Sequence, residues 1–217
     1  MNSIKKIYIE SVTPKISYSG VDGGFKPFTI YLNIPENGNG CIKQLKEMMH
    51  SRFGIHRNYA GKPESSFGIE LNYSSVNCAE TLIIGDKTPV GIDIENRDTS
   101  MADEFVSEQY FSDGERKLLE DKSFGDNKFL ILWTRREALL KMIGTGLIDE
   151  MKYLDLRDGS SIFPDKFLEV VDVTYDYYYL KTFLIGGKYV ISYCCADTER
   201  EFQVVLLGGE SELTFNY

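Results

Sequence analysis

Two acidic side chains lie close together in the stretch "VGIDIEN" at residues 90–96. Its apolar residues alternate with small or acidic ones, which is typical of a strand, so Asp93 and Glu95 share one face with Gly91. With Cα atoms about 6.5–7 Å apart, two such carboxylates can reach one hard cation, and they repel each other when nothing neutralises them. The alternative is an ordinary strand with one acidic face in water, which the motif alone favours.

A helix with few polar residues supplies further charges. The stretch "FLILWTRREALLKMIG" at residues 129–144 places Arg136 on a face with leucines and lines up Glu137 and Lys141 along its edge. Charged groups on a mostly buried helix are costly unless they have partners or hold a ligand. The structural alternatives are a surface pair of Glu137 with Lys141, in the favourable i to i+4 order, and an Arg136 side chain whose head reaches water.

The functional hypothesis combines both stretches. Glu137 would join Asp93 and Glu95 around one cation. Lys141 and Arg136 would face an anionic group bound to that cation. Mg²⁺ suits such a set, because it prefers carboxylate, water and phosphate oxygens and neutralises a pyrophosphate well. The sequence therefore predicts a site for magnesium-dependent phosphate chemistry.

The elements that must position these groups have both strand and helix patterns, which predicts an α+β fold. Strands are expected at residues 6–12, 28–32, 69–74, 80–84, 90–95, 168–175, 178–185 and 189–195. Helices are expected at 41–53, 102–110, 113–120 and 127–143, the last stopped by Gly144 and Gly146.

An internal similarity bears on the domain organisation. The stretch "TLIIGDKTPVGI" at 81–92 resembles "TFLIGGKYVISY" at 182–193, and each has the pattern of a β-hairpin. We therefore expect two pseudo-symmetric halves, 1–96 and 97–217, each a small, mostly antiparallel sheet packed with helices. The site would lie in the cleft between them. Two unrelated hairpins that are similar by chance are the alternative.

Composition limits the partners and the compartment. A net charge of −9 over 217 residues argues against nucleic-acid or anionic-membrane binding, since both need a basic surface. No apolar run approaches the roughly 18 residues of a membrane span, and the first residues lack the pattern of a secretion signal. The four cysteines have no metal-binding spacing. We expect a cytoplasmic protein with reduced core thiols.

Together the two charged stretches resemble the signature of the 4′-phosphopantetheinyl transferase superfamily. "VGIDIE" matches its first part, and the second part is matched by Trp133, Thr134, Arg136, Glu137, Ala138 and Lys141. The chain length and the internal similarity resemble the monomeric, surfactin-synthetase-activating type with two similar halves. "YAGKP" at 59–63 is similar to the family's Gly-Lys-Pro stretch near the nucleotide of coenzyme A. "YFSDGERKLL" at 110–119 and "GKYVISYCC" at 187–195 also resemble family segments.

The resemblance implies a reaction and a site. The phosphopantetheine arm of coenzyme A would pass to a serine of an apo acyl or peptidyl carrier protein, releasing 3′,5′-ADP. The implied Mg²⁺ ligands are Asp93, Glu95 and Glu137, and the implied catalytic residues are Asp93, Glu137 and Lys141. The proton acceptor stays open between a carboxylate such as Glu137 and water. The implied coenzyme A contacts are Gly61, Lys62, Pro63, Asn72, Tyr73, Arg136 and Lys141. The protein would act as a monomer.

Two departures from the family pattern leave alternatives open. Asn72, Tyr73 and Ser74 stand where the family has Ser-His-Ser, so a phenol replaces an imidazole. The arginine expected upstream is missing from "PENGNGC", and Lys43, His56 and Arg57 are the candidates to replace it. The alternatives are a magnesium-dependent phosphodiester or pyrophosphate hydrolase, and a homologue that binds coenzyme A or a carrier protein without turnover.

Docking of the carrier protein is expected at the basic and apolar segment 111–128. The residues that suggest it are Phe111, Arg116, Lys117, Leu118, Leu119, Lys122 and Lys128. An ordinary solvated helix with core leucines is the alternative.

Overall fold

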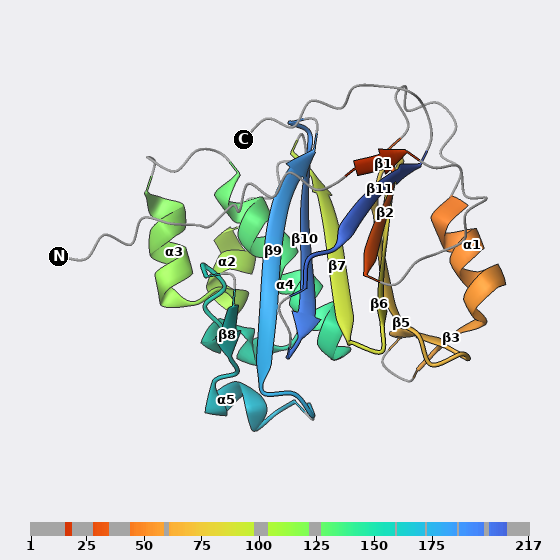
Figure 1. Ribbon diagram of the computed structural model, residues 1–217. Coiled ribbons are helices and arrows are strands. Elements are labelled where there is room, and N and C mark those ends of the chain that lie inside the picture. Colours follow the sequence, from red (N-terminus) through yellow and green to blue (C-terminus); the bar gives the residue numbers. More distant parts are fainter. Residues whose placement is uncertain are drawn as a thin grey trace.

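Two β-sheets form the centre of the molecule, which we describe from a computed structural model (Figure 1). The structure describes residues 16–18, 28–34, 44–58, 61–97, 104–121, 127–158, 160–171, 173–185, 187–197 and 200–207. The five-stranded sheet has the order β1 (Ile16–Tyr18), β11 (Gln203–Leu207), β2 (Thr29–Asn33), β6 (Ala79–Asp86), β5 (Glu70–Val76). The four-stranded, antiparallel sheet has the order β7 (Val90–Asn96), β10 (Tyr189–Ala196), β9 (Tyr177–Ile185), β8 (Ser160–Ile162). A separate hairpin consists of β3 (Ile55–Arg57) and β4 (Pro63–Ser65).

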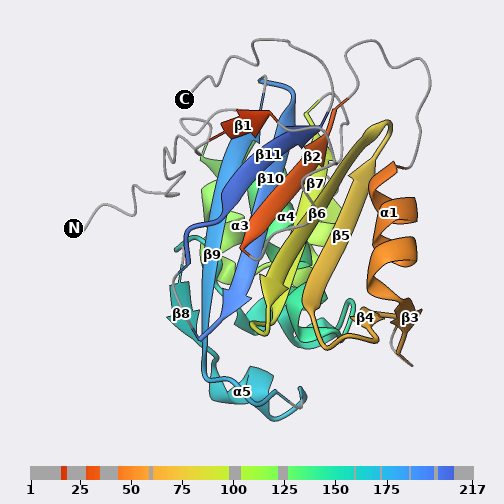
Figure 2. The same cartoon turned by 45° about the vertical axis from the view of Figure 1, so that its right-hand side comes forward.

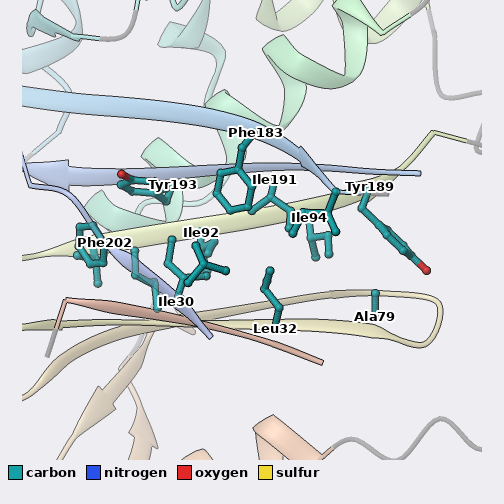
Figure 3. Close-up of a cluster of buried hydrophobic side chains, with 14 of the residues drawn as sticks. Ile30, Leu32, Ala79, Ile92, Ile94, Phe183, Tyr189, Ile191, Tyr193 and Phe202 are labelled. Carbon is teal, nitrogen blue, oxygen red and sulfur yellow. The ribbon is translucent and has the colours of Figure 1, made fainter. Parts of the chain in front are cut away.

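The sheets pack face to face, and helices cover their outer faces (Figures 1 and 2). The helices are α1 (Gln44–Phe53), α2 (Glu104–Tyr110), α3 (Asp113–Glu120), α4 (Lys128–Ile143), the 3-10 helix η3 (Asp149–Tyr153) and α5 (Asp165–Leu168). Side chains of both sheets fill the space between them, as Figure 3 shows for Ile30 and Leu32 on one side and Ile92 and Ile191 on the other. Helix α1 packs on the outer face of the five-stranded sheet through Leu45, Met49 and Phe53.

Helix α4 covers the outer face of the four-stranded sheet. Ala138, Leu139 and Met142 pack there against buried residues of β9 and β10. Gly91 lets the helix approach β7 closely, because a Cβ atom at that position would lie 1.9 Å from the carbonyl oxygen of Ala138. The helix ends at Gly144, whose φ of 93° is a conformation that glycine adopts readily.

The elements agree with most of the sequence expectations. The strands expected at 28–32, 69–74, 80–84, 90–95, 178–185 and 189–195 are confirmed within two residues. The helices at 113–120 and 127–143 are confirmed as closely. The structure describes the helix expected at 41–53 from Gln44 onward and the helix expected at 102–110 from Glu104 onward. The expected strand at 6–12 lies outside the described residues.

The strand expected at 168–175 is wrong. Residues 165–168 form the short helix α5, and none of the described residues in 169–171 and 173–175 is in a strand. Phe163, Phe167 and Val171 are buried in one cluster with Ala138, Leu139 and Met142 of α4. Their spacing of four residues suits a helical turn, whereas a strand would bury every second residue.

The internal similarity corresponds to one hairpin, not two. Strands β9 and β10 pair as a hairpin with Ile185 opposite Tyr189, as expected. The first stretch turns sharply after Gly85 instead, where the amide of Thr88 donates to the Gly85 carbonyl, and β7 joins the other sheet. As a result, each sheet contains strands from both sides of the expected boundary at 96/97, with β7 in one and β11 in the other.

Among the described residues, no helix is long and apolar enough to cross a membrane.

Candidate active site

Three elements meet at the carboxylate of Asp93. The apolar residues of β7 point into the core between the sheets, and the alternation of the strand therefore turns Asp93 toward α4. One oxygen, Oδ1, accepts hydrogen bonds from Lys141 Nζ of α4 at 2.5 Å and from Ser74 Oγ of β5 at 2.8 Å. Lys141 Nζ also lies 3.0 Å from Ser74 Oγ. The strand and helix motifs are thus in direct contact, as the sequence predicts.

Two further carboxylates lie in the electric field of this pair. Burial raises the pKa of Glu95 from 4.5 to about 7, with a further contribution from the charge of Asp93. Burial, and then the charge of Asp93, also raise the pKa of Glu137. Lys141 opposes both shifts. The three carboxylates repel one another, and one lysine compensates them only in part.

The donor set suits a hard cation. The second oxygen of Asp93, Oδ2, is buried and has no hydrogen-bond partner among the described residues, although carboxylate oxygens in such places normally have one. Carboxylates are the side-chain ligands that Mg²⁺ prefers. In the described part of the chain, no three Asp, Glu, His or Cys side chains converge closely enough to hold a metal, and Asp93 is paired with Lys141. The carboxylates of Asp93, Glu95 and Glu137 are therefore of the type that binds Mg²⁺. In this structure, however, Asp93 forms an ion pair with the ammonium group of Lys141.

A pocket of about 190 Å³ opens beside this cluster. It is lined by Arg57, Gly61, Lys62, Pro63, Asn72, Tyr73, Glu137, Leu140, Lys141, Gly144 and Gly146. The structure therefore brings seven of the predicted site residues together, from the β3–β4 hairpin, β5 and α4. The charged lining residues are two lysines, one arginine and one glutamate, which favours an anionic ligand.

Hydrogen bonds fix the walls of this pocket to the end of α4. Lys62 Nζ donates to the carbonyl oxygen of Met142 at 2.8 Å and lies 3.7 Å from a Glu70 oxygen. Asn72 Nδ2 donates to the Lys141 carbonyl at 3.3 Å. A lysine near the last carbonyls of a helix interacts favourably with the helix dipole, and it retains other N–H groups for a ligand.

Arg136 lies elsewhere, which corrects the expectation that it faces the bound anion. Its side chain is 0% exposed, and Nη2 lies 2.7 Å from Oε2 of the equally buried Glu115. The guanidinium lies 4.5 Å from the ring centre of Phe111. Arg135 is also fully buried, with Nε bonded to Thr182 Oγ1 at 2.8 Å. The arginines of this apolar helix therefore bind protein groups, and of its charged side chains only Glu137 and Lys141 line the pocket.

Tyr73 does not replace the expected imidazole as a donor to phosphate. Its neighbours Asn72 and Ser74 both contact Lys141 of α4, whereas its hydroxyl donates to Glu80 Oε1 at 2.8 Å. Its ring packs against the cluster that α1 covers. Strand alternation explains the difference, since Tyr73 points to the opposite face. The phenolic proton is already used by Glu80.

Of the two described candidates to replace the missing arginine, Arg57 and His56, only Arg57 lines the pocket. Arg57 lines the pocket, and its Nη1 donates to the Gly61 carbonyl at 2.5 Å. His56 points to Glu64, 3.4 Å away, and is not among the lining residues. Lys43 lies outside the described residues.

Sequence reasoning missed two residues of this region. Ser74 bridges the lysine and the aspartate, and its even spacing from Asn72 in a strand was the available signal. Glu115 pairs with Arg136, but nothing local indicates a contact between residues 21 positions apart.

Comparison with known proteins identifies the same region. Residues 89–194 match the family model described as the 4′-phosphopantetheinyl transferase superfamily. Over 106 residues the chain is 36% identical to the 4′-phosphopantetheinyl transferase gsp of Aneurinibacillus migulanus, covering 48% of this chain and 44% of that protein. Over 157 residues it is 27% identical to the 4′-phosphopantetheinyl transferase Sfp of Bacillus subtilis (strain 168), covering 70% of this chain and 64% of that protein. The chain thus spans less than two thirds of the length of either relative.

Proposed function

This chain belongs, through residues 89–194, to the 4′-phosphopantetheinyl transferase superfamily, and on that premise we propose that it transfers the 4′-phosphopantetheine arm of coenzyme A. The acceptor is a serine of an apo acyl or peptidyl carrier protein, and the second product is 3′,5′-ADP. The observation that carries the proposal is the pocket in which Lys62 and Arg57 of the hairpin meet Glu137 and Lys141 of the family motif.

The pocket residues are assigned to coenzyme A by charge. Lys141, beside Asp93, faces the pyrophosphate at the reacting end, and Lys62 and Arg57 bind phosphate groups from the hairpin. The remaining contacts to the nucleotide come from Gly61, Pro63, Asn72 and the backbone of Tyr73. Arg136 has no place in this set, because it is buried against Glu115.

The metal is proposed to be Mg²⁺, held by Asp93, Glu95 and Glu137. The partnerless oxygen of Asp93 and the raised pKa values of both glutamates support this set, because a bound cation would satisfy the first and stabilise the charged forms of the second. When bound, the ion would neutralise charge on the pyrophosphate.

The reaction needs positioning and charge stabilisation more than covalent help from the protein. The serine oxygen of the carrier forms a bond to the phosphorus that bears the pantetheine arm, while the bond from that phosphorus to the bridging oxygen breaks. Lys141 stabilises the negative charge that develops on the phosphate oxygens. The proton acceptor stays open between Glu137 and a water molecule, because a cation bound to Glu137 would stabilise its charged form and make it a weaker base.

Partners and state follow the family. We propose that coenzyme A and an acidic carrier protein are the partners and that the protein acts as a cytoplasmic monomer. The division into halves 1–96 and 97–217 stays a prediction, and so do their pseudo-symmetry and the cleft between them.

Mass spectrometry of an apo carrier protein, after incubation with this protein, coenzyme A and Mg²⁺, tests the proposal. A gain of the phosphopantetheine mass on the carrier, with one 3′,5′-ADP per transfer, is the expected result. Cleavage of coenzyme A without an acceptor would identify a hydrolase instead. Tight binding of coenzyme A without either product would identify a binding protein.

A further inference from the structure

Helix α4 must be held at one rotation about its own axis if Glu137 and Lys141 are to face Asp93. Helix α4 is apolar on nearly every side, and only Trp133, Glu137, Lys141 and Ile143 of its sixteen residues are not buried. Apolar packing alone discriminates weakly between rotations of such a helix, because each rotation buries similar side chains. Neighbouring positions differ by about 100°, so a small rotation would move Glu137 and Lys141 away from Asp93.

A buried polar network contacts α4 at Arg136, one position before Glu137. Arg136 Nη2 binds Glu115 Oε2 at 2.7 Å and the carbonyl of Leu154 at 3.2 Å. Glu115 also accepts from the amide of Ser112 at 2.8 Å and from that of Leu156 at 2.9 Å. A single carboxylate thus links the start of α3, the segment after η3 and the middle of α4.

Burial of this ion pair costs desolvation free energy, which indicates that the network does more than stabilise the fold. Both partners are 0% exposed, and Nε and Nη1 of Arg136 are buried with no hydrogen-bond partner in the part of the chain that the structure describes. Apolar residues of similar volume often stabilise a fold as well as a buried ion pair does, whereas directional contacts specify one arrangement. Only one rotation of α4 brings the guanidinium to Glu115, and that rotation also brings Lys141 to Asp93.

We propose that Glu115 and Arg136 are a positioning pair that fixes the rotation of α4 and thereby places Glu137 and Lys141 at the pocket. The placement of Glu137 and Lys141 follows from the contacts of α4, and the expected effect on kcat rests on the proposed function. Neither residue touches the substrate.

The decisive variant replaces both charges at once, Glu115→Leu with Arg136→Met, so that no charge is left buried alone. We expect its melting temperature to stay within about 5 °C of the wild-type value. Its kcat for phosphopantetheine transfer should fall about tenfold or more, because Glu137 and Lys141 are misplaced. The matched control is Lys128→Met, which removes another buried cation of α4, bonded to carbonyls at the end of α3. It should lower the melting temperature and leave kcat near the wild-type value.

A second readout needs no catalysis. Lys141 is paired with Asp93, so acetic anhydride should acetylate it slowly relative to the exposed Lys117, as measured by mass spectrometry. In the double variant we expect this relative rate to rise several-fold. If the wild type neither transfers the arm nor binds coenzyme A, the proposed function fails, and the acetylation rates still decide the positioning role.

A folded double variant with wild-type kcat and wild-type acetylation of Lys141 would overturn the inference. If that variant does not fold, Arg136→Lys decides, because it keeps the positive charge and loses the planar fork. We expect it to fold with a reduced kcat and faster acetylation of Lys141. Wild-type values of both would overturn the inference equally.

Discussion

Asp93 is 3% exposed, and its two carboxylate oxygens have different surroundings. Oδ1 accepts hydrogen bonds from Lys141 and Ser74, while Oδ2 is buried and no described residue bonds to it. Lys141 neutralises part of the charge of Asp93, and the other oxygen of the same carboxylate can still bind a cation. This arrangement suits a site that binds a metal and a phosphate together. At the scale of single residues, the chemistry is therefore testable by removing one charge at a time.

Replacing Asp93 by alanine should remove the metal affinity of the site. In the wild type, Mg²⁺ should raise the melting temperature, because an ion that binds only the folded state stabilises it. In Asp93→Ala we expect no such shift and no transfer activity. A shift of wild-type size in a thermal melt of this variant would show that Asp93 is not a ligand.

Lys141→Ala should lower kcat more than it raises the KM for coenzyme A, as expected for a charge that matters most in the transition state. Steady-state kinetics with an apo carrier protein measure both constants. Lys188→Ala, a change of an exposed lysine on the β9–β10 turn, is the control and should leave both unchanged. A change confined to KM would mean that Lys141 only binds the ground-state phosphate.

Arg57→Ala should reduce the discrimination between coenzyme A and its 3′-dephospho form. The wild-type protein should prefer coenzyme A, because Arg57 lines the pocket and an arginine can bind a phosphate monoester through two N–H groups. We expect the ratio of the two kcat/KM values to approach one in the variant. His56→Ala, one position earlier and paired with Glu64, is the control. An unchanged ratio in Arg57→Ala would assign the 3′-phosphate to another group.

At the scale of elements, the site depends on the contact between β7 and α4. Asp93 lies on the strand, whereas Glu137 and Lys141 lie on the helix, so their distances follow from how closely the two elements pack. Gly91 permits this packing, since a Cβ there would meet Ala138 O at 1.9 Å and Met142 N at 2.5 Å. The glycine of the "VGID" motif therefore has a packing role in this chain.

Gly91→Ala should push α4 away from β7. We expect a loss of stability of about 1–3 kcal/mol, typical of overpacking, together with a lower kcat. Chemical denaturation and steady-state kinetics measure the two effects. Gly68→Ala is the control, because its Cβ would meet nothing within 4 Å, although φ is +68°. It should cost some stability through backbone strain and leave kcat unchanged. Wild-type stability in Gly91→Ala would contradict the close approach.

At the scale of the whole molecule, the net charge of −9 opposes association with an acidic carrier protein. Docking must then use a local surface. The expected segment 111–128 is partly unsuitable, because Phe111 and Leu118 are buried and Lys128 Nζ donates to carbonyls at the end of α3. The exposed Lys117 and the half-buried Arg116 and Leu119 of α3 remain as candidates, and Lys122 lies outside the described residues.

Reversing both charges, with Arg116→Glu and Lys117→Glu, should raise the KM for the carrier protein and leave the KM for coenzyme A nearly unchanged. The effect should be largest at low ionic strength, where screening is weakest. Titrations of the carrier protein at two salt concentrations measure it. An unaltered carrier KM at low salt would move the docking surface away from α3.

Most of the local structure could be predicted from the amino-acid sequence alone. Its two charged motifs predicted the family, which the comparison confirms, and the contact between the strand of Asp93 and the helix of Lys141. Period-2 and period-3.6 patterns predicted the core strands and the helices from α2 to α4, because each element has one face or stripe that must be buried. A local sequence pattern is enough to predict a strand or a helix when it determines which face of that element is buried.

Which partner each charged or polar side chain binds became evident from the tertiary structure. Arg136 lies one position before Glu137, yet it binds Glu115. Tyr73 lies between Asn72 and Ser74, which both contact Lys141, yet its hydroxyl binds Glu80. The turn after Gly85 likewise sends β6 and β7 into different sheets, although the sequence resembles a hairpin. These outcomes depend on contacts between residues far apart in the chain, and a local pattern carries no information about which distant group will complete a buried pair.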